Sequence, residues 1–200
     1  MQFQAEIASQ LEGDVDIEAM IQAVPRSFRI RGLFLRPLCA ELGARVSALG
    51  PRLEEPPPPG GYRPLSFYPT RDFLRLFDAA ARLAYPALGG REAHRRRAHK
   101  EIEVFARSIL GRATLSVIRS PVAALLRYPE SFGMLASGPS AEARQEGPAL
   151  VRVALHGYEG SVEYPLGVLE GLVMSFGATP RTEVSAPTPG TLVFRIGWAD

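Results

Sequence analysis

The chain has little of the chemistry that marks secreted or membrane proteins. It holds one cysteine, Cys39, in 200 residues, which excludes a disulfide framework and any zinc or iron–sulfur site built from several cysteines. No apolar run reaches the roughly 18 residues that a membrane-spanning helix needs. Residues 1–6 lack the basic-then-apolar layout of a secretory signal. We therefore expect a cytoplasmic protein with no membrane attachment.

Lysine and asparagine are scarce as well. Lys100 is the only lysine among 23 basic residues, and the sequence contains no asparagine. This bias is typical of a GC-rich genome, so the pI near 8.9 is weak evidence for nucleic-acid binding. The densest basic run, residues 94–100, falls on a predicted helix whose successive side chains point about 100° apart, and glutamates flank it. We expect no nucleic-acid partner.

The sequence also lacks the motifs of common catalytic sites. It has no Gly-x-Ser-x-Gly elbow, no glycine-rich phosphate loop with a lysine, and no His-Glu-x-x-His pair. Cys39 falls on the apolar stripe of its predicted helix, where an unreactive core thiol is expected. We therefore predict that the protein is not an enzyme. An unrecognised enzyme would need a cleft that gathers Arg95, Glu170 or His156.

The first 126 residues are predicted to be mostly helical. Apolar residues recur at helical spacing between caps and prolines, and only residues 28–31 alternate as a strand does. The prolines and glycines within residues 54–64 cannot join a helix or a sheet interior, so a stiff loop is predicted there. The predicted helices are 17–24, 35–42 with Pro37 in the first turn, 71–83 with Thr70 as the cap, 92–110, and 115–126 with Pro121 inside.

Strand patterns dominate after Gly147. The predicted strands are 149–155, 182–185 and 191–198. A helix from about Pro165 to Phe176 is predicted between the first two, since a proline start and a glycine stop at Gly177 follow the usual asymmetry of helix ends. This order predicts the α+β class, with N-terminal helices packed on a C-terminal antiparallel sheet. The chain is expected to be a single domain, with residues 1–13 as a flexible or loosely packed N-terminus.

Several short motifs stand in a characteristic order. They are Val24-Pro25 with Ile30–Phe34 and Leu38, Tyr68-Pro69 with Phe73–Leu76, Ala79 to Pro86, Phe105 with Leu110–Arg112, and Gly167–Gly171 with Gly177-Ala178. In this order they resemble a family of uncharacterised myxobacterial paralogues, a domain of unknown function about this long. More remotely, the layout is similar to haem-based nitric-oxide-binding domains, 4-vinyl-reductase-type ligand-binding domains and Bet3-like subunits of tethering complexes. The resemblance implies a regulatory domain that binds a ligand or a protein.

The sequence departs from the haem-binding and metal-binding branches of that fold. In the haem-binding branch, the resemblance implies that an axial histidine holds the haem iron and that a Tyr-x-Ser-x-Arg motif binds the haem propionates. Residues 128–133 lack the arginine and place the serine out of register, and no histidine lies between His99 and His156. The metal-binding vinyl-reductase-type domains use a C-terminal cysteine cluster, which this chain lacks. We therefore predict no haem, no metal and no other cofactor.

Two charged residues are of interest because they fall among apolar positions. Arg95 lies on the apolar stripe of its helix, which predicts partial burial with either a carboxylate partner or a ligand anion. Glu170 lies in the predicted glycine-rich helix, either at the surface or at the edge of a groove with a raised pKa. The histidines are expected at the surface, since His94 and His99 are five residues apart and not at metal-binding spacing.

Two functions remain open at this point. The first is a non-enzymatic regulatory domain that binds a small apolar ligand or a partner protein between the helices and the sheet, as a homodimer. Its predicted ligand contacts are Arg95, Phe105 and Glu170. The second is a purely structural protein–protein interaction module. It would dock through the proline-rich loop or through a ridge of small residues, including Gly167 and Gly171, that lets another backbone approach closely.

Overall fold

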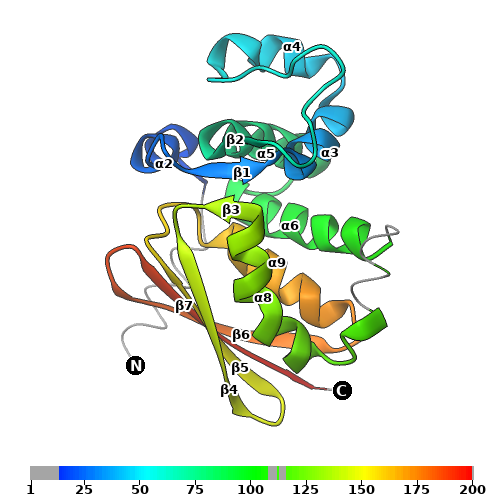
Figure 1. Cartoon of the computed structure of the whole chain (residues 1–200), viewed down its shortest axis with the longest axis vertical. Coiled ribbons are helices and arrows are strands. Elements are labelled where there is room, and N and C mark those ends of the chain that lie inside the picture. Colours follow the sequence, from blue (N-terminus) through cyan, green and yellow to red (C-terminus); the bar gives the residue numbers. More distant parts are fainter. Residues whose placement is uncertain (1–13, 108–111, 113–115, 200) are drawn as a thin grey trace.

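The polypeptide folds into helices and antiparallel sheets (Figure 1). The computed structural model describes residues 14–107, 112 and 116–199. Both sheets found there are antiparallel, so the predicted α+β class is confirmed. The N-terminus predicted to be loose, residues 1–13, lies outside the described residues. None of the described helices is both long and apolar enough to cross a lipid bilayer.

The first part of the chain forms an N-terminal layer of helices with two strands of a small sheet. Asp16 caps the first of these helices by accepting the Ala19 N–H at 3.0 Å. Gly43, with φ at 55°, ends the next long helix as the sequence indicates. The elements are α2 (Ile17–Ala23), β1 (Arg29–Arg31), α3 (Gly32–Leu42), α4 (Arg45–Leu49), a 3-10 turn (Gly50–Arg52), β2 (Phe67–Pro69) and α5 (Thr70–Ala84).

The starts of three helices differ from the prediction. Helix α3 begins directly after β1, so Pro37 lies beyond the first turn. Helix α5 begins at Thr70 itself, and no side chain caps it. Pro121 is not inside a helix but begins α8 (Pro121–Leu135), where the Ser120 side chain accepts the Ala123 N–H at 3.2 Å. A proline at this position loses no hydrogen bond, because the first N–H groups of a helix have no intrahelical acceptor.

The proline-rich stretch 54–64 contains no helix or strand and is held to α5 by a buried carboxylate. Asp72 is fully buried and accepts the N–H groups of Glu54 and Glu55 at 2.7 and 2.8 Å. Tyr62, also buried, donates its hydroxyl to the Glu55 carbonyl at 2.9 Å. These bonds satisfy the buried polar groups and fix the start of the loop against the N-terminal layer.

The second part of the chain contains the larger sheet and its covering helices. Strand β4 was not predicted, because its alternating residues are small or charged and not apolar. The helix predicted from Pro165 begins two residues earlier, since proline fits anywhere in the first turn of a helix. The elements are α6 (Gly90–Arg107), α8, β3 (Ala136–Ser137), β4 (Ser140–Gly147), β5 (Leu150–His156), α9 (Glu163–Met174), β6 (Thr179–Thr188) and β7 (Thr191–Ala199). Residues 108–110 of the predicted helix 92–110 lie outside the described residues.

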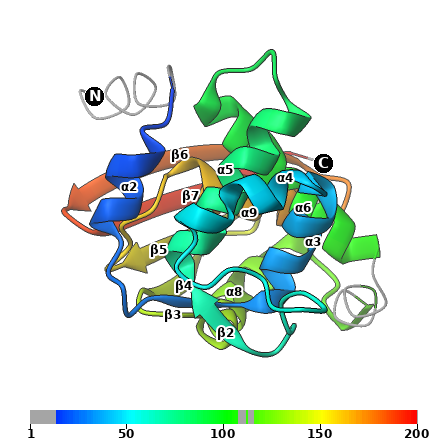
Figure 2. The same ribbon diagram turned by 90° about the horizontal axis from the view of Figure 1, so that it is seen from above.

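The two sheets connect the layers. The small sheet has the order β2-β1-β3, so Ile30 of β1 pairs with Tyr68 of β2 and with Ala136 of β3, which follows α8. The larger sheet has the order β4-β5-β7-β6, and α8 and α9 cover one of its faces (Figure 1). Seen from above, α3, α4 and α5 lie over α6 and α9 (Figure 2). Helix α6 therefore lies between the N-terminal layer and α9, and it packs on both α5 and α9.

Candidate functional site

An apolar cavity of about 60 Å³ lies where the two layers meet. Its floor consists of the buried side chains Val24, Ile30, Phe73 and Leu74. Its rim includes the exposed residues Ser137 and Glu159, which lie in β3 and after β5. Residues from the N-terminal layer and from the C-terminal elements thus enclose one space.

Local periodicity points the floor residues toward this space. Phe28 and Ile30 are two residues apart at β1, so their side chains share one face of the strand. Phe73 and Leu74 lie in the first turns of α5, on the face that packs inward. Gly138, with φ at 119°, allows the Phe28 ring to lie against the end of β3, because a Cβ there would be 2.3 Å from that ring. The glycine is required both by the backbone conformation and by this close contact.

Aromatic rings limit the size of the cavity. Tyr164 of α9 meets Phe73 and Phe77 edge to face, with ring centroids 5.2 and 5.0 Å apart. The His94 ring of α6 contacts Phe77 in the same way at 5.2 Å. Edge-to-face pairs of this kind stabilise defined ring positions. The space between α5, α6 and α9 is therefore filled by side chains, and the small cavity beside Tyr164 stays open.

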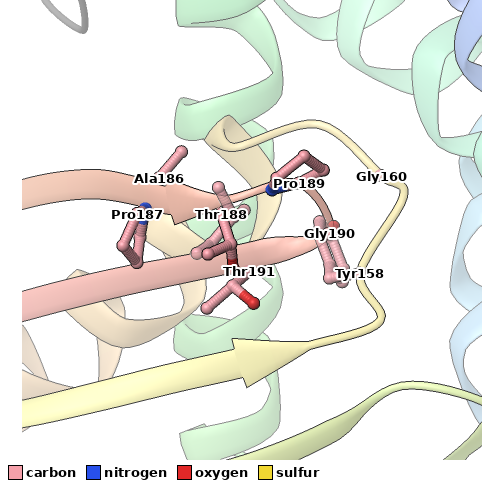
Figure 3. A pocket seen from close by; sticks show the side chains of 9 residues that line it. Tyr158, Gly160, Ala186, Pro187, Thr188, Pro189, Gly190 and Thr191 are labelled. Atoms are coloured by element: carbon pink, nitrogen blue, oxygen red, sulfur yellow. The ribbon is translucent and has the colours of Figure 1, made fainter.

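An open groove of about 330 Å³ adjoins the cavity. The turn between β6 and β7 forms one side of it, and the loop between β5 and α9 forms the other (Figure 3). Tyr158 and Gly160 line both hollows, so their loop separates the cavity from the groove. The Tyr158 N–H donates to the Gly190 carbonyl at 3.0 Å, and its hydroxyl donates to the Ser161 carbonyl at 3.1 Å. The first bond anchors the Tyr158 backbone to the turn, and the second positions its ring.

A partly buried ionic cluster joins α6 to α9, apart from the cavity and the groove. The Arg95 Nε and Nη2 atoms donate to the two carboxylate oxygens of Glu170 at 2.8 and 2.9 Å. The His99 Nε2 atom lies 2.8 Å from Glu170 Oε2, and Glu92 lies 3.6 Å from Arg95. The two charged residues that the sequence singles out therefore contact each other. Arg95 has a carboxylate partner within the chain.

Glu170 is not at the surface, because its side chain is only 4% exposed. Burial raises the pKa of the Glu170 carboxyl, but hydrogen bonds from His99 and Arg95 outweigh burial and lower the pKa below its usual value. The expectation of a raised pKa is therefore wrong. A desolvated carboxylate favours its charged form when donors of this kind surround it.

Small residues let α6 and α9 approach closely. A Cβ atom on Gly167 would lie 2.4 Å from the Arg95 carbonyl oxygen and 2.7 Å from the Ala98 Cβ. A Cβ atom on Gly171 would lie 3.0 Å from the Ile102 Cβ. Both glycines therefore face α6 of the same chain, and this contact accounts for the ridge of small residues without a second chain.

Further polar residues of α6 are buried. His94, expected at the surface, is 1% exposed, and its Nε2 atom lies 2.9 Å from Asp78 Oδ1. Glu101 lies 3.6 Å from Arg97, which in turn lies 3.1 Å from Glu41 of α3. Burial raises the pKa of Glu101 to about 7 although Arg97 opposes the shift. The spacing of these α6 residues, three and four apart, is a sequence signal that could have placed them on one inward face.

The other residues singled out from the sequence lie apart from this cluster. Phe105 is half-buried on α6 and lines neither the cavity nor the groove. His156 ends β5 and lies 3.8 Å from the Glu142 carboxylate, not at the Arg95–Glu170 pair. Sequence reasoning missed Tyr158 and Tyr164, which line the cavity. Their only signal is the position of two aromatic residues in a glycine-rich segment between a strand and a helix.

A family model matches residues 23–199, which is most of the chain. The chain belongs to the DUF2378 family. That family is described as a protein of unknown function, so the match establishes relatedness and assigns no role to the DUF2378 chain. The predicted membership of a family of unknown function is confirmed. No curated protein matches the chain.

The DUF2378 chain is similar in structure to H-NOX proteins. The Fe(II) unliganded H-NOX protein from K. algicida has a TM-score of 0.63 at 14% identity, covering 86% of this chain and 97% of that chain. A mutant of T. Tengcongensis H-NOX has a TM-score of 0.60 at 19% identity, with 84% and 95% covered. An oxygen-binding H-NOX domain related to soluble guanylate cyclases has a TM-score of 0.61 at 18% identity, with 84% and 93% covered. These values show a shared fold, as the resemblance to haem-based domains implies.

The residues of the DUF2378 chain do not fit haem. Pockets for ligands of that size measure roughly 300–1,000 Å³, whereas the apolar cavity measures about 60 Å³, and the groove of about 330 Å³ is open to solvent and not enclosed. In the part of the chain that the structure describes, no histidine, cysteine or methionine lines either hollow, although haem iron is commonly held by such a side chain. Among the described residues, no three His, Cys, Asp or Glu side chains are grouped so that they could hold a metal ion. We therefore derive no chemistry through haem.

Proposed function

We propose that this protein is a non-enzymatic regulatory domain that binds a small apolar ligand in the cavity between its two layers. The observation that carries the proposal is the cavity, with its floor of Val24, Ile30, Phe73 and Leu74. Water in such a space finds few hydrogen-bond partners, so apolar cavities stay dry and accept apolar molecules. The fold shared with H-NOX proteins, one of which binds oxygen, supports a ligand-binding role.

The cavity volume limits the ligand. An engineered apolar cavity of about 150 Å³ accepts benzene or xenon, and the present cavity is less than half as large. The ligand that fits is therefore an apolar molecule of a few heavy atoms. Specificity comes from size and from the apolar character of the floor.

The position of the cavity supports a regulatory role. Ile30 and Ala136 both line it and are paired across the β1–β3 junction that ties the N-terminal layer to the C-terminal elements. A ligand in the cavity contacts both parts at once. If its contacts differ between two arrangements of the layers, its binding shifts the balance between them. Occupancy of the cavity would then be coupled to the arrangement of the two layers.

Xenon tests the proposal, because it is a small apolar probe. Under xenon pressure, methyl NMR signals of Val24, Ile30 and Leu74 are expected to shift in a saturable manner. Ala136→Leu fills the cavity and is expected to abolish these shifts. Ala44→Leu, at an exposed alanine, is the matched control and retains them. Unperturbed wild-type signals, or equal shifts in Ala136→Leu, would contradict the proposal.

A second candidate function is association with another protein chain, as a homodimer. The observation that favours it is an exposed apolar patch of Leu65, Phe67 and Met134, which are 76%, 40% and 58% exposed. Arg31 holds the patch together, since it donates to the carbonyl groups of Leu65 and Met134 and its guanidinium lies 4.0 Å from the Phe67 ring centroid. A twofold dimer would place the same patch on both chains. Sedimentation of wild type and Leu65→Glu tests this, and a wild-type monomer at all concentrations excludes it.

A further inference from the structure

The ring of Tyr158 stands between the interior cavity and the surface groove. We propose that Tyr158 determines which ligands enter the cavity, because its ring closes the cavity against the groove and limits the ligand to molecules smaller than an aromatic ring. Removing or displacing the ring joins the two hollows into one site for benzene-sized apolar molecules. This inference deepens the proposed function and rests on it.

The first line of evidence is the shared lining. Tyr158 and Gly160 line the cavity of about 60 Å³ and also the groove of about 330 Å³. The groove is open to solvent at the turn between β6 and β7, where Tyr158 lies beside Gly190 (Figure 3). The floor of the cavity includes the buried side chains Phe73 and Leu74 of α5. The Tyr158 loop is thus a thin partition between solvent and the apolar interior.

The second line of evidence is the way Tyr158 is held. Its two hydrogen bonds run to carbonyl groups, one on Gly190 in the β6–β7 turn and one on Ser161 in its own loop. Neither bond involves the floor of the cavity or α5. Displacing the ring therefore breaks the hydroxyl bond to Ser161 in its own loop and breaks no hydrogen bond to the N-terminal layer. The Tyr158 loop is thus the wall that we expect to open.

The third line of evidence is the contact with Gly160. A Cβ atom added there would lie 2.5 Å from the Tyr158 hydroxyl oxygen and 2.7 Å from its Cζ atom. The ring lies against the glycine, and only glycine permits this position. The atoms that would clash are the far end of a side chain, so Gly160→Ala displaces the ring and leaves the backbone in place.

The volume that Tyr158→Ala adds to the cavity is expected to let the variant bind a larger ligand than wild type does. Tyr158→Ala removes a phenol ring, which is itself slightly larger than benzene. The vacated space adds to a cavity of about 60 Å³ and approaches the volume of about 150 Å³ that accepts benzene in an engineered core. In wild type, with the ring in place, the cavity itself is too small for benzene.

Benzene is the probe for this inference, and calorimetric unfolding of the full chain is the measurement. A ligand that binds only the folded state raises the unfolding temperature, and it does so more strongly the higher its affinity. Benzene is expected to raise the unfolding temperature of Tyr158→Ala and Gly160→Ala, with a dissociation constant at least tenfold lower than for wild type. Tyr85→Ala is the matched control, because Tyr85 is also half-buried but lines neither hollow.

The outcomes separate this inference from the proposed function. Xenon shifts in wild type together with no benzene effect on folded Gly160→Ala would overturn the role of Tyr158 alone. Equal benzene stabilisation of wild type and both variants would also overturn it. Absence of xenon shifts in wild type overturns the proposed function itself. Gly160→Ala retains the tyrosine, so it decides the question even where Tyr158→Ala does not fold.

Discussion

Arg95 and Glu170 are 75 residues apart in the sequence and meet in a two-point ion pair between α6 and α9. The Glu170 side chain is 4% exposed and the Arg95 side chain 35%. The carboxylate is therefore desolvated, while the guanidinium still reaches solvent. The His99 Nε2 atom lies 2.8 Å from the same carboxylate. The hydrogen-bond partners of the Glu170 carboxylate therefore all come from its own chain. The cluster joins two helices, and the Arg95 guanidinium is already paired with carboxylates of its own chain.

Glu170→Gln is expected to lower the free energy of unfolding by about 2 kcal/mol, because hydrogen bonds to a charged group contribute about 1.5–3 kcal/mol. The pKa of Glu170 is lowered in the folded state from its ordinary 4.5, so the charged form stabilises the fold above pH 4.5. This stabilisation disappears as the pH falls through the folded-state pKa. Urea unfolding measured stepwise from about pH 7 into the acid range follows this loss.

The control for this prediction is Glu92→Gln. Glu92 faces the same arginine at 3.6 Å but is 37% exposed, so its loss is expected to cost less than about 1 kcal/mol. Equal losses in the free energy of unfolding for the two substitutions at neutral pH would show that the Arg95–Glu170 pair does not stabilise the contact between α6 and α9. A Glu170→Gln effect that persists in acid would also contradict the prediction.

Gly167→Ala tests the close approach of α6 and α9. The added Cβ would meet backbone at 2.4 Å, so the helices must separate, and overpacking of this kind typically costs about 1–3 kcal/mol. Gly133→Ala on α8 is the matched control, since nothing lies within 4 Å of its added Cβ. Alanine there is expected to be neutral or to stabilise the helix by up to about 1 kcal/mol. A neutral Gly167→Ala in denaturant unfolding would be inconsistent with the packing.

Glu101 is expected to make the protein less stable as the pH rises from 4.5 to about 7. Burial raises its folded-state pKa from 4.5 to about 7, so in this window the unfolded chain loses its proton while the folded chain keeps it. The loss is at most about 3 kcal/mol, at about 1.36 kcal/mol per pKa unit. Glu101→Gln should match wild type below this window and exceed its stability above it. A wild-type stability that does not fall between pH 4.5 and about 7 would contradict the prediction.

Haemin titration is expected to show no stoichiometric binding. The cavity of about 60 Å³ is too small, and none of the described residues that line it is a histidine, cysteine or methionine. Absorbance in the Soret region should equal that of free haemin, with the K. algicida H-NOX protein as the positive control. A saturable Soret shift with one haem per chain would refute this prediction and with it the assignment of the cavity to small apolar ligands.

Several elements follow from local sequence alone. Strands β5 and β7 agree with the predicted ranges to within one residue, because alternation of apolar residues directly encodes a half-buried strand. Asp16 and Gly43 mark helix ends by bonds and dihedral angles within four residues. Strand β4 escaped prediction since its place is decided by pairing with β5 and not by its own residues.

The contacts within the candidate site could not be predicted from local sequence. Arg95 and Glu170 were singled out separately, each as a charge among apolar residues, but nothing in the sequence shows that they pair with each other. The cavity brings together residues from Val24 to Tyr164, and its volume depends on how aromatic rings from α5 and α9 pack. Tyr158 gains its position through Gly160, the Ser161 carbonyl and the turn at Gly190.

Local sequence was enough for the α+β class, the order of most helices and strands, and the charged residues within the apolar stripes. These depend on capping, turn residues and periodicity, which act between residues a few positions apart. The family was indicated separately, by resemblance in the order of short motifs along the chain. Three-dimensional packing was needed to show that Glu170 is buried with its hydrogen bonds made, that Gly167 serves an internal helix contact, and that the apolar space between the layers is a cavity of about 60 Å³. Those outcomes depend on which side chains fill the space between distant elements, and packing at that scale is a property of the whole fold.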